Sequence, residues 1–192
     1  MNAVLRVVGV LFDPAAEWQW IEKDPGDTIY LLAYYVAPLA ILPAICGFIG
    51  GCIIGAVVPG VGTVRVPIFD GLLAAIFGYA ASFVVVLLVA LWIAALAPRF
   101  GGRRDFAAAL KLAVYSFTPV WLTGIALILP GLHFLELTGL YGAYLLVKGL
   151  PVLMKVPEQR SQSYAAAIVA FAAVLILATA VAQRALFVPG AI

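Results

Sequence analysis

Charged residues are scarce in this chain. Only 10% of its 192 residues are Asp, Glu, Lys or Arg, whereas 66% are hydrophobic. A soluble domain has about one quarter charged and about one half apolar residues, so a single core cannot bury the apolar excess found here. The net charge of +2 is too small to indicate a nucleic-acid surface, and we expect no nucleic-acid partner. The composition predicts a protein that faces lipid.

Residues that carry catalysis or bind metals are also rare. The chain has one histidine and two cysteines, and it lacks a glycine-rich phosphate loop, a nucleophile elbow and an HExxH pair. Cys46 and Cys52 fall on different faces of one expected helix, so we interpret them as packing residues rather than a disulfide. We therefore expect no enzymatic activity, no cofactor and no bound metal.

Long apolar runs dominate the sequence instead. A membrane-spanning helix needs about 20 apolar residues, and five runs reach that length. We predict an all-α polytopic membrane protein, a bundle of five transmembrane helices at residues 30–58, 68–97, 106–129, 132–154 and 164–187. This transmembrane domain occupies residues 29–192 and follows a cytoplasmic amphipathic segment at residues 1–28.

The amphipathic segment contains its own helix signals. Asp13 followed by Pro14 is typical of a helix N-cap and first helical position. In the helix AAEWQWIEKD, Trp18 and Ile21 share one face. Tryptophans beside charges favour a short helix in the membrane interface, although a water-exposed helix is the alternative. The apolar run around Arg6 lacks a small-residue cleavage site, so we expect no cleavable signal peptide.

The distribution of basic residues predicts the orientation. One side of the expected spans holds Arg6, Lys23, Arg99, Arg103, Arg104, Lys111, Lys148, Lys155 and Arg160, and the other holds Arg65 and Arg184. Basic residues collect on the cytoplasmic side, so we predict a bacterial inner-membrane protein with a cytoplasmic N-terminus and a periplasmic or extracellular C-terminus. Arg99, Arg103, Arg104 and Lys155 are candidate contacts for anionic lipid headgroups, although their orienting role explains them equally well.

Small residues recur at every fourth position in three of the expected spans. Such a stripe forms a groove that admits the backbone of another helix, and we call it a helix-packing seam. The predicted seams contain Gly47, Gly51 and Gly55 in the first span, Ala74, Gly78 and Ser82 in the second, and Gly139 and Ala143 in the fourth.

Ionisable residues at two span ends form a candidate ion or ligand site. Asp70 begins the second span, His133 and Glu136 begin the fourth, and Arg65 lies in the loop before Asp70. Both spans run inward, so the four residues are expected at a similar depth, where an ionisable group is a functional candidate. We expect His133 or Arg65 beside a carboxylate. Structural pairing and solvation at the interface are the alternatives.

Three segments carry a resemblance to a known family. They are Phe12-x-Pro14-x3-Trp18-x2-Ile21, LKLAVYSFTPVWL from Leu110 to Leu122, and LYGAYLLVKGLPVLMKVPEQRSQSY from Leu140 to Tyr164. With them the chain resembles a compact prokaryotic member of the Yip family, named for proteins that interact with Rab-type (Ypt) GTPases. The resemblance implies five spans, a cytosolic N-terminus and a helical bundle. Eukaryotic members work in vesicle trafficking and membrane shaping and have a longer cytosolic N-terminal region. With only residues 1–28 before the first span, we expect the segment that would meet a GTPase to be largely absent here.

Two functions fit these observations. The first is a non-enzymatic scaffold that organises the membrane or binds a partner, with the lipid bilayer and a second copy or another membrane protein as partners. The second is a small transporter or channel that uses the outward-facing acidic and histidine cluster. A transporter predicts a water-filled cavity that reaches the cluster, whereas a scaffold predicts tight packing there.

Overall fold

The computed structural model confirms a helical membrane protein. It describes residues 3–25, 27–58, 60, 62–128 and 139–187. Within them, four helical stretches are long and apolar enough to cross a membrane: Thr28–Ile54, Ile68–Phe100, Phe106–Ile128 and Glu158–Phe187. The remaining expected span contains the shorter helix α8 (Tyr141–Leu153), and its residues 132–138 lie outside the described residues. The number of five spans therefore stays a prediction.

The first span is built from α3 (Thr28–Leu31), η1 (Leu32–Val36), α4 (Ala37–Phe48) and η2 (Ile49–Ile54). The π-helical turn η1 precedes Pro38, whose ring would clash with the carbonyl group four residues back in a regular α-helix. The helix ends at Gly55, which has a φ of 80°, a conformation that glycine adopts without strain. Beyond it, β1 (Ala56–Val58) pairs antiparallel with β2 (Gly62–Val64). This hairpin replaces the last turn of the predicted span.

The second and third spans are also built from consecutive helical segments. The second contains α5 (Ile68–Leu96) and η3 (Ala97–Phe100), and the third contains α6 (Phe106–Ser116), α7 (Thr118–Thr123) and η4 (Gly124–Ile128). The third is interrupted at Phe117, two residues before Pro119, as proline interruptions usually are. Asp105 caps α6 by accepting a hydrogen bond from the Ala108 backbone N at 3.1 Å.

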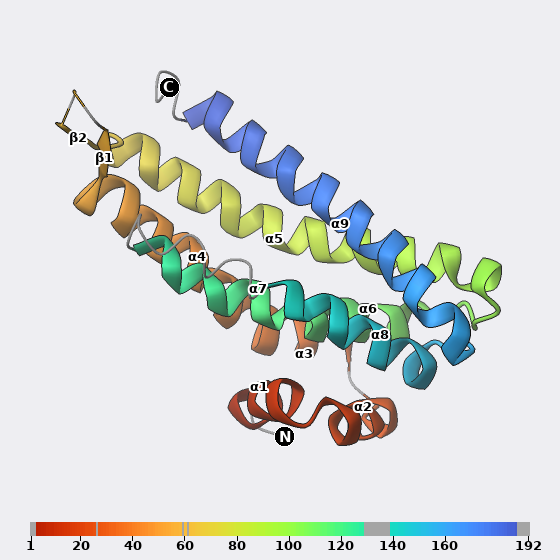
Figure 1. The fold of residues 1–192 in the computed structure, drawn as a ribbon. Helices are drawn as coiled ribbons and strands as arrows, with labels where there is room; N and C mark the ends of the chain where they lie inside the picture. The colour runs from red at the N-terminus through yellow and green to blue at the C-terminus, as the bar shows by residue number, and fades with distance from the viewer. Residues whose placement is uncertain (1–2, 26, 59, 61, 129–138, 188–192) are drawn as a thin grey trace.

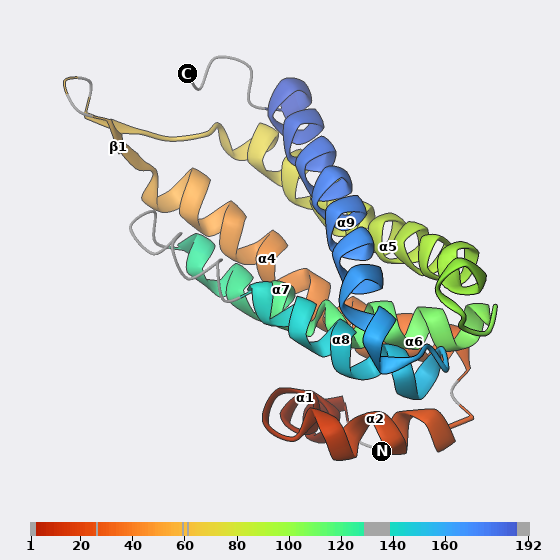
Figure 2. The same cartoon turned by 45° about the vertical axis from the view of Figure 1, so that its right-hand side comes forward.

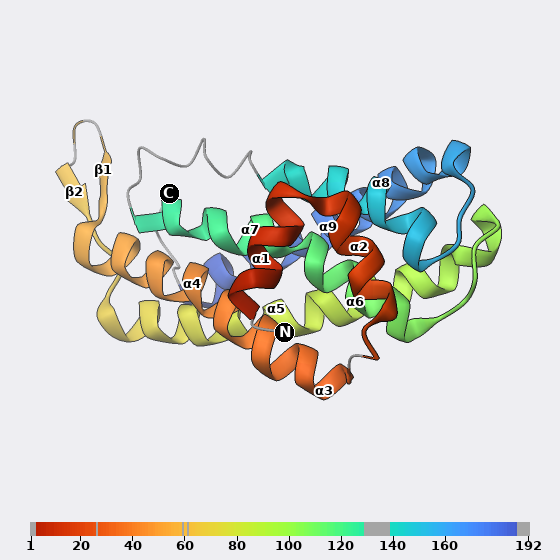
Figure 3. The same ribbon diagram turned by 90° about the horizontal axis from the view of Figure 1, so that it is seen from below.

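The helices pack into a bundle with one tightly packed end. In Figure 1, α5 lies along α9 (Glu158–Phe187) and also contacts α6, while α4 packs against α7 and η4. The loop after η3 and the turn between α8 and α9 gather at one end, and β1 and β2 lie at the other (Figures 1 and 3). The core lies toward the first end, where Ile93, Leu112, Leu145 and Ile168 are fully buried.

The N-terminal segment forms a separate layer on the bundle (Figure 2). Helices α1 (Ala3–Phe12) and α2 (Pro14–Lys23) make up this N-terminal hairpin, and α2 packs on α8. The predicted cap is confirmed, because the Asp13 carboxylate accepts a hydrogen bond from the Ala16 backbone N. Trp18 and Ile21 are 1% exposed. The apolar face of α2 therefore packs on protein, not on lipid.

Candidate functional site

The predicted helix-packing seams line one cavity. It has a volume of about 720 Å³ and lies between α4, α5, η4, α8 and α9. Its wall includes the seam residues Gly47, Gly51, Ala74, Gly78, Ser82, Gly139 and Ala143. Gly55 is the exception because it follows the end of the first span. Small side chains from three spans thus surround a space.

The hydroxyl groups on this wall are mostly satisfied within their own helices. Serine and threonine side chains can reach the carbonyl oxygen three or four residues back. Three of them do so here: Ser82 to Gly78 at 3.0 Å, Thr123 to Val120 at 3.0 Å and Thr179 to Leu175 at 2.8 Å. Ser116 is buried on the wall, and its hydroxyl has no partner among the described residues. The wall therefore offers few polar groups to an occupant.

Gln183 joins two helices on the cavity wall. Its Nε2 donates a hydrogen bond from α9 to the Ala74 carbonyl oxygen of α5 at 2.7 Å. The missing side chain of Gly78 makes room, because a methyl group there would lie 3.2 Å from the same nitrogen. Gln183 was not among the residues predicted from the sequence, although a polar residue facing a small-residue stripe is a recognisable signal for an interhelical hydrogen bond.

Close backbone contacts occur at glycines outside the predicted seams. A methyl group at Gly50 would overlap the carbonyl oxygen of Leu127 in η4, and one at Gly142 would overlap that of Ser116. By contrast, methyl groups at Gly47 and Gly51 would meet side-chain atoms only at 3.7 Å, an ordinary contact distance. Helix packing in this molecule therefore depends on Gly50 and Gly142, which the every-fourth-residue pattern did not select.

The predicted ionisable cluster is described only in part. Asp70 is half-buried in the first turn of α5 and is not part of the cavity wall. Arg65 is exposed, and its Nε donates to the Ile54 carbonyl oxygen at 3.4 Å. No ion pair joins these two described side chains. His133 and Glu136 lie outside the described residues, so the cluster stays a prediction. Within the described residues, no group of His, Cys, Asp and Glu could hold a metal.

A buried ionic centre joins the two helices of the N-terminal hairpin. Arg6 is 6% exposed. Its Nη1 contacts the Glu17 Oε1 at 2.8 Å, and its Nη2 contacts the Asp24 Oδ2 at 2.6 Å. The guanidinium also lies 6.0 Å from the centre of the Tyr115 ring in α6. From the sequence, Arg6 was predicted only to be an orienting charge. Its isolated position in an apolar helix was the available signal for burial.

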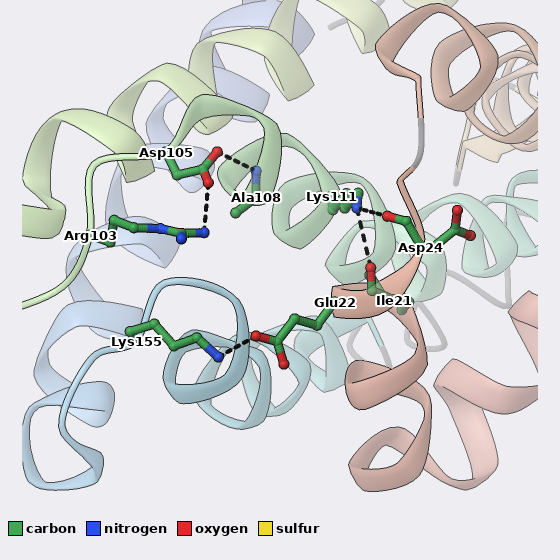
Figure 4. A network of polar contacts seen from close by, with 8 residues as sticks. All are labelled: Ile21, Glu22, Asp24, Arg103, Asp105, Ala108, Lys111 and Lys155. Carbon is green, nitrogen blue, oxygen red and sulfur yellow. Dashed lines mark hydrogen bonds and ion pairs between the residues drawn. The ribbon is translucent and has the colours of Figure 1, made fainter.

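Two lysines hold the C-terminal end of α2 (Figure 4). Lys111 of α6 donates to the carbonyl oxygens of Ile21, at 3.2 Å, and Asp24. Lys155, in the turn before α9, forms an ion pair with Glu22. Carbonyl groups at a helix C-terminus carry partial negative charge, so cations there stabilise the helix and its docking.

The same contacts occupy two of the candidate headgroup ligands. Lys155 binds Glu22, and Arg103 binds Asp105 at 2.7 Å. Arg99 and Arg104 are exposed. The headgroup assignment stays a prediction for all four residues, with Arg99 and Arg104 better placed to reach a lipid.

A family model described as the Yip1 domain matches residues 8–181, from within α1 to within α9. The chain belongs to the Yip1 domain family. It is also 28% identical over 170 residues to "Inner membrane protein YohC" of Escherichia coli strain K12, covering 86% of this chain and 87% of the relative. The protein of the same name from Escherichia coli O6:H1 matches equally. No solved structure matches significantly. The resemblance to the Yip family is thus confirmed, and this Yip1-domain protein is an integral membrane protein.

Proposed function

We propose that this Yip1-domain protein is a non-enzymatic scaffold that organises a bacterial inner membrane through its N-terminal hairpin. The observation that carries the proposal is which side chains α1 buries and which it exposes. This helix buries Arg6 and exposes apolar side chains, including Val4 at 65% and Phe12 at 83%. A helix on a soluble protein does the opposite. An exposed apolar helix face beside membrane spans supports contact with the interface of the bilayer.

The contacts of the hairpin give this face a fixed position. The ion pairs of Arg6 link α1 to α2, and Lys111 and Lys155 attach α2 to the bundle. The Tyr141 hydroxyl also donates to the Leu11 carbonyl oxygen of α1 at 2.9 Å. A rigid apolar surface inserted into one leaflet occupies area there without crossing to the other. That asymmetry is the proposed means of organising the membrane.

A second copy or another membrane protein is a further proposed partner of the same face. The apolar side chains Val4, Leu5, Val8 and Phe12 form a stripe on α1, and a stripe of this kind also fits a helix of a neighbouring protein. The bilayer is the first choice because Trp20, in α2 of the same hairpin, is exposed and has the Lys23 ammonium 5.7 Å from the centre of its ring. Such an aromatic and basic pair is typical of the headgroup region.

The second candidate function is a transporter, and the cavity is the observation that favours it. Its volume falls within the range of about 300–1,000 Å³ that is usual for small-molecule sites. However, Arg184 is the one charged residue on the described part of the wall, and Asp70 is not on it. The mostly apolar wall supports an apolar occupant better than a hydrophilic substrate, so the scaffold remains the better supported function.

The proposed orientation predicts the result of reporter fusions. The excess of basic residues near the packed end supports a cytoplasmic turn at Gly101 and a C-terminus outside. An alkaline phosphatase fused at the C-terminus should therefore be active, and one inserted after Gly101 inactive, with a fluorescent protein giving the opposite pattern. Equal activity at both positions would show that the number of spans or their boundaries are wrong.

The hairpin proposal predicts a change in vesicle shape. Reconstitution of the protein into vesicles of phosphatidylethanolamine and phosphatidylglycerol should lower their mean diameter in cryo-electron micrographs. The double variant Val8→Asp/Phe12→Asp should leave the diameter near that of protein-free vesicles, because ionised carboxylates do not enter the apolar interface. Both side chains are exposed, so the variant should keep its thermal midpoint in detergent.

The control places a single carboxylate on a polar surface. Gln162→Asp changes an exposed residue near the N-terminus of α9, where a carboxylate is tolerated, and this variant should shrink vesicles as the original protein does. The proposal fails if the double variant shrinks them equally. Release of an encapsulated dye by the original protein alone would favour the transporter instead.

A further inference from the structure

We propose that the cavity between α4, α5, α8 and α9 binds an acyl chain of a phospholipid taken laterally from the bilayer. This site is separate from the N-terminal hairpin and goes beyond the proposed scaffold function. Apart from the shorter α8, the helices around the cavity are long and apolar enough to cross a membrane. An opening between such helices faces the bilayer, so the molecules available to fill it are the surrounding phospholipids with their acyl chains.

The lipid chain is proposed to enter beside the second half of α9. In the described part of α9, the buried residues are Ser161, Tyr164, Ala165 and Ile168, all in its first half. Beyond them, α9 places Ala172 and Ile176 on the cavity wall while Val174 and Leu177 are exposed. The second half of α9 therefore separates the cavity from lipid with one layer of side chains.

The chemistry of the wall selects a chain without polar groups. Three of its hydroxyls are already bonded to carbonyl oxygens of their own helices, and the Gln183 amide is bonded to the Ala74 carbonyl. The unpartnered Ser116 can turn toward its own helix in the same way. An empty cavity forfeits dispersion contacts along its whole lining. A flexible apolar chain restores them without leaving any further polar group unpaired.

Two tryptophans make the proposal testable. Trp121 is 3% exposed and lies on the cavity wall, whereas Trp92 is 36% exposed and stacks on Phe171. Bromine atoms on an acyl chain quench tryptophan fluorescence on contact. Two variants would be reconstituted in vesicles of phosphatidylcholine brominated on its chains. Trp20→Phe/Trp92→Phe reports on Trp121, and Trp20→Phe/Trp121→Phe reports on Trp92. Buried Trp18 gives both the same background.

Both variants should lose fluorescence in the brominated vesicles. Filling the cavity with Ala143→Leu should restore the signal of Trp121 and leave that of Trp92 quenched. If this variant folds poorly, Ala172→Leu fills the same space from α9. The matched control Ala95→Leu adds the same atoms at an exposed position of α5 and should change neither signal.

Two results would overturn the proposal. In the first, Trp92 is quenched by bromine while Trp121 is not, which would show a cavity closed to lipid. In the second, aqueous iodide quenches Trp121 in ordinary vesicles, which would show a cavity filled with water. Neither result bears on the vesicle diameters that test the N-terminal hairpin, so the two proposals can fail separately.

Discussion

Arg6→Met is expected to release the N-terminal hairpin and to lower the free energy of unfolding by about 3–5 kcal/mol, the usual cost of removing one partner of a buried ion pair. The methionine fills similar space but provides no charge. Glu17, whose side chain is 12% exposed, would then be left as a buried carboxylate without a counter-ion. Asp24 is 40% exposed and would regain water, so its share of the loss should be small.

The loss should be visible as a lower midpoint of denaturation in mild detergent and as faster proteolysis within residues 3–25. Lys23→Met is the matched control, because it removes a charge of the same sign from an exposed position of the same hairpin. Its effect should stay within about 0.5 kcal/mol. Adding Glu17→Gln to Arg6→Met should recover part of the stability, since the buried charge is then gone. An Arg6→Met protein as stable as the control would show that the ion pairs do not hold the hairpin.

Local chemistry made the spans and caps predictable from sequence. Apolar runs of the required length mark most of the crossing helices, because lipid accepts no other continuous surface. Asp13 and Asp105 act on backbone groups only three residues away, so their capping roles can be read directly. The interruption before Pro119 follows in the same way from the missing N–H group of proline. Each of these features depends on near neighbours in the chain.

The partners of Arg6 could not be found by the same reasoning. Glu17 and Asp24 lie 11 and 18 residues further along the chain, and the turn at Asp13 decides that α2 folds back onto α1. Charge counting assigns an arginine near a span to the cytoplasmic side, but it does not show whether the residue is buried. The sequence shows that α1 has many apolar side chains. It does not show that they are exposed, because this depends on Arg6 occupying the buried face of the helix.

The helix-packing seams show a second limit of prediction from the sequence. A repeat of four identifies residues that share a helix face, and the described members within the spans do share one cavity wall. The repeat carries no information about how closely the facing helix approaches. That distance is set by the interrupted third span, whose η4 segment brings its backbone close to Gly50, whereas Gly47 and Gly51 have room for a methyl group at an ordinary distance from neighbouring side chains. The partner of Arg65 was not predictable from the sequence either, because its side chain donates a hydrogen bond to the Ile54 carbonyl oxygen at the end of the first span instead of pairing with Asp70.

Gly50→Ala is expected to destabilise the protein far more than Gly51→Ala, although the two glycines are adjacent. The added methyl group at Gly50 would overlap the Leu127 carbonyl oxygen, so η2 and η4 must move apart. Overpacking of this kind costs about 1–3 kcal/mol. At Gly51 the methyl group would meet the Val66 Cγ2 at 3.7 Å and gain a contact, and alanine is also the better helix former.

Denaturation of both variants in the same detergent would measure the difference. Neighbouring positions point about 100° apart around a helix, so the pair compares two faces of one helix with the same chemical change. A lower midpoint for Gly50→Ala and an unchanged or higher one for Gly51→Ala would place the close backbone contact at η4. The reverse order would mean that the first span packs through its Gly47 and Gly51 face. The cavity beside that face would then be closed, and the acyl-chain site would lose its space.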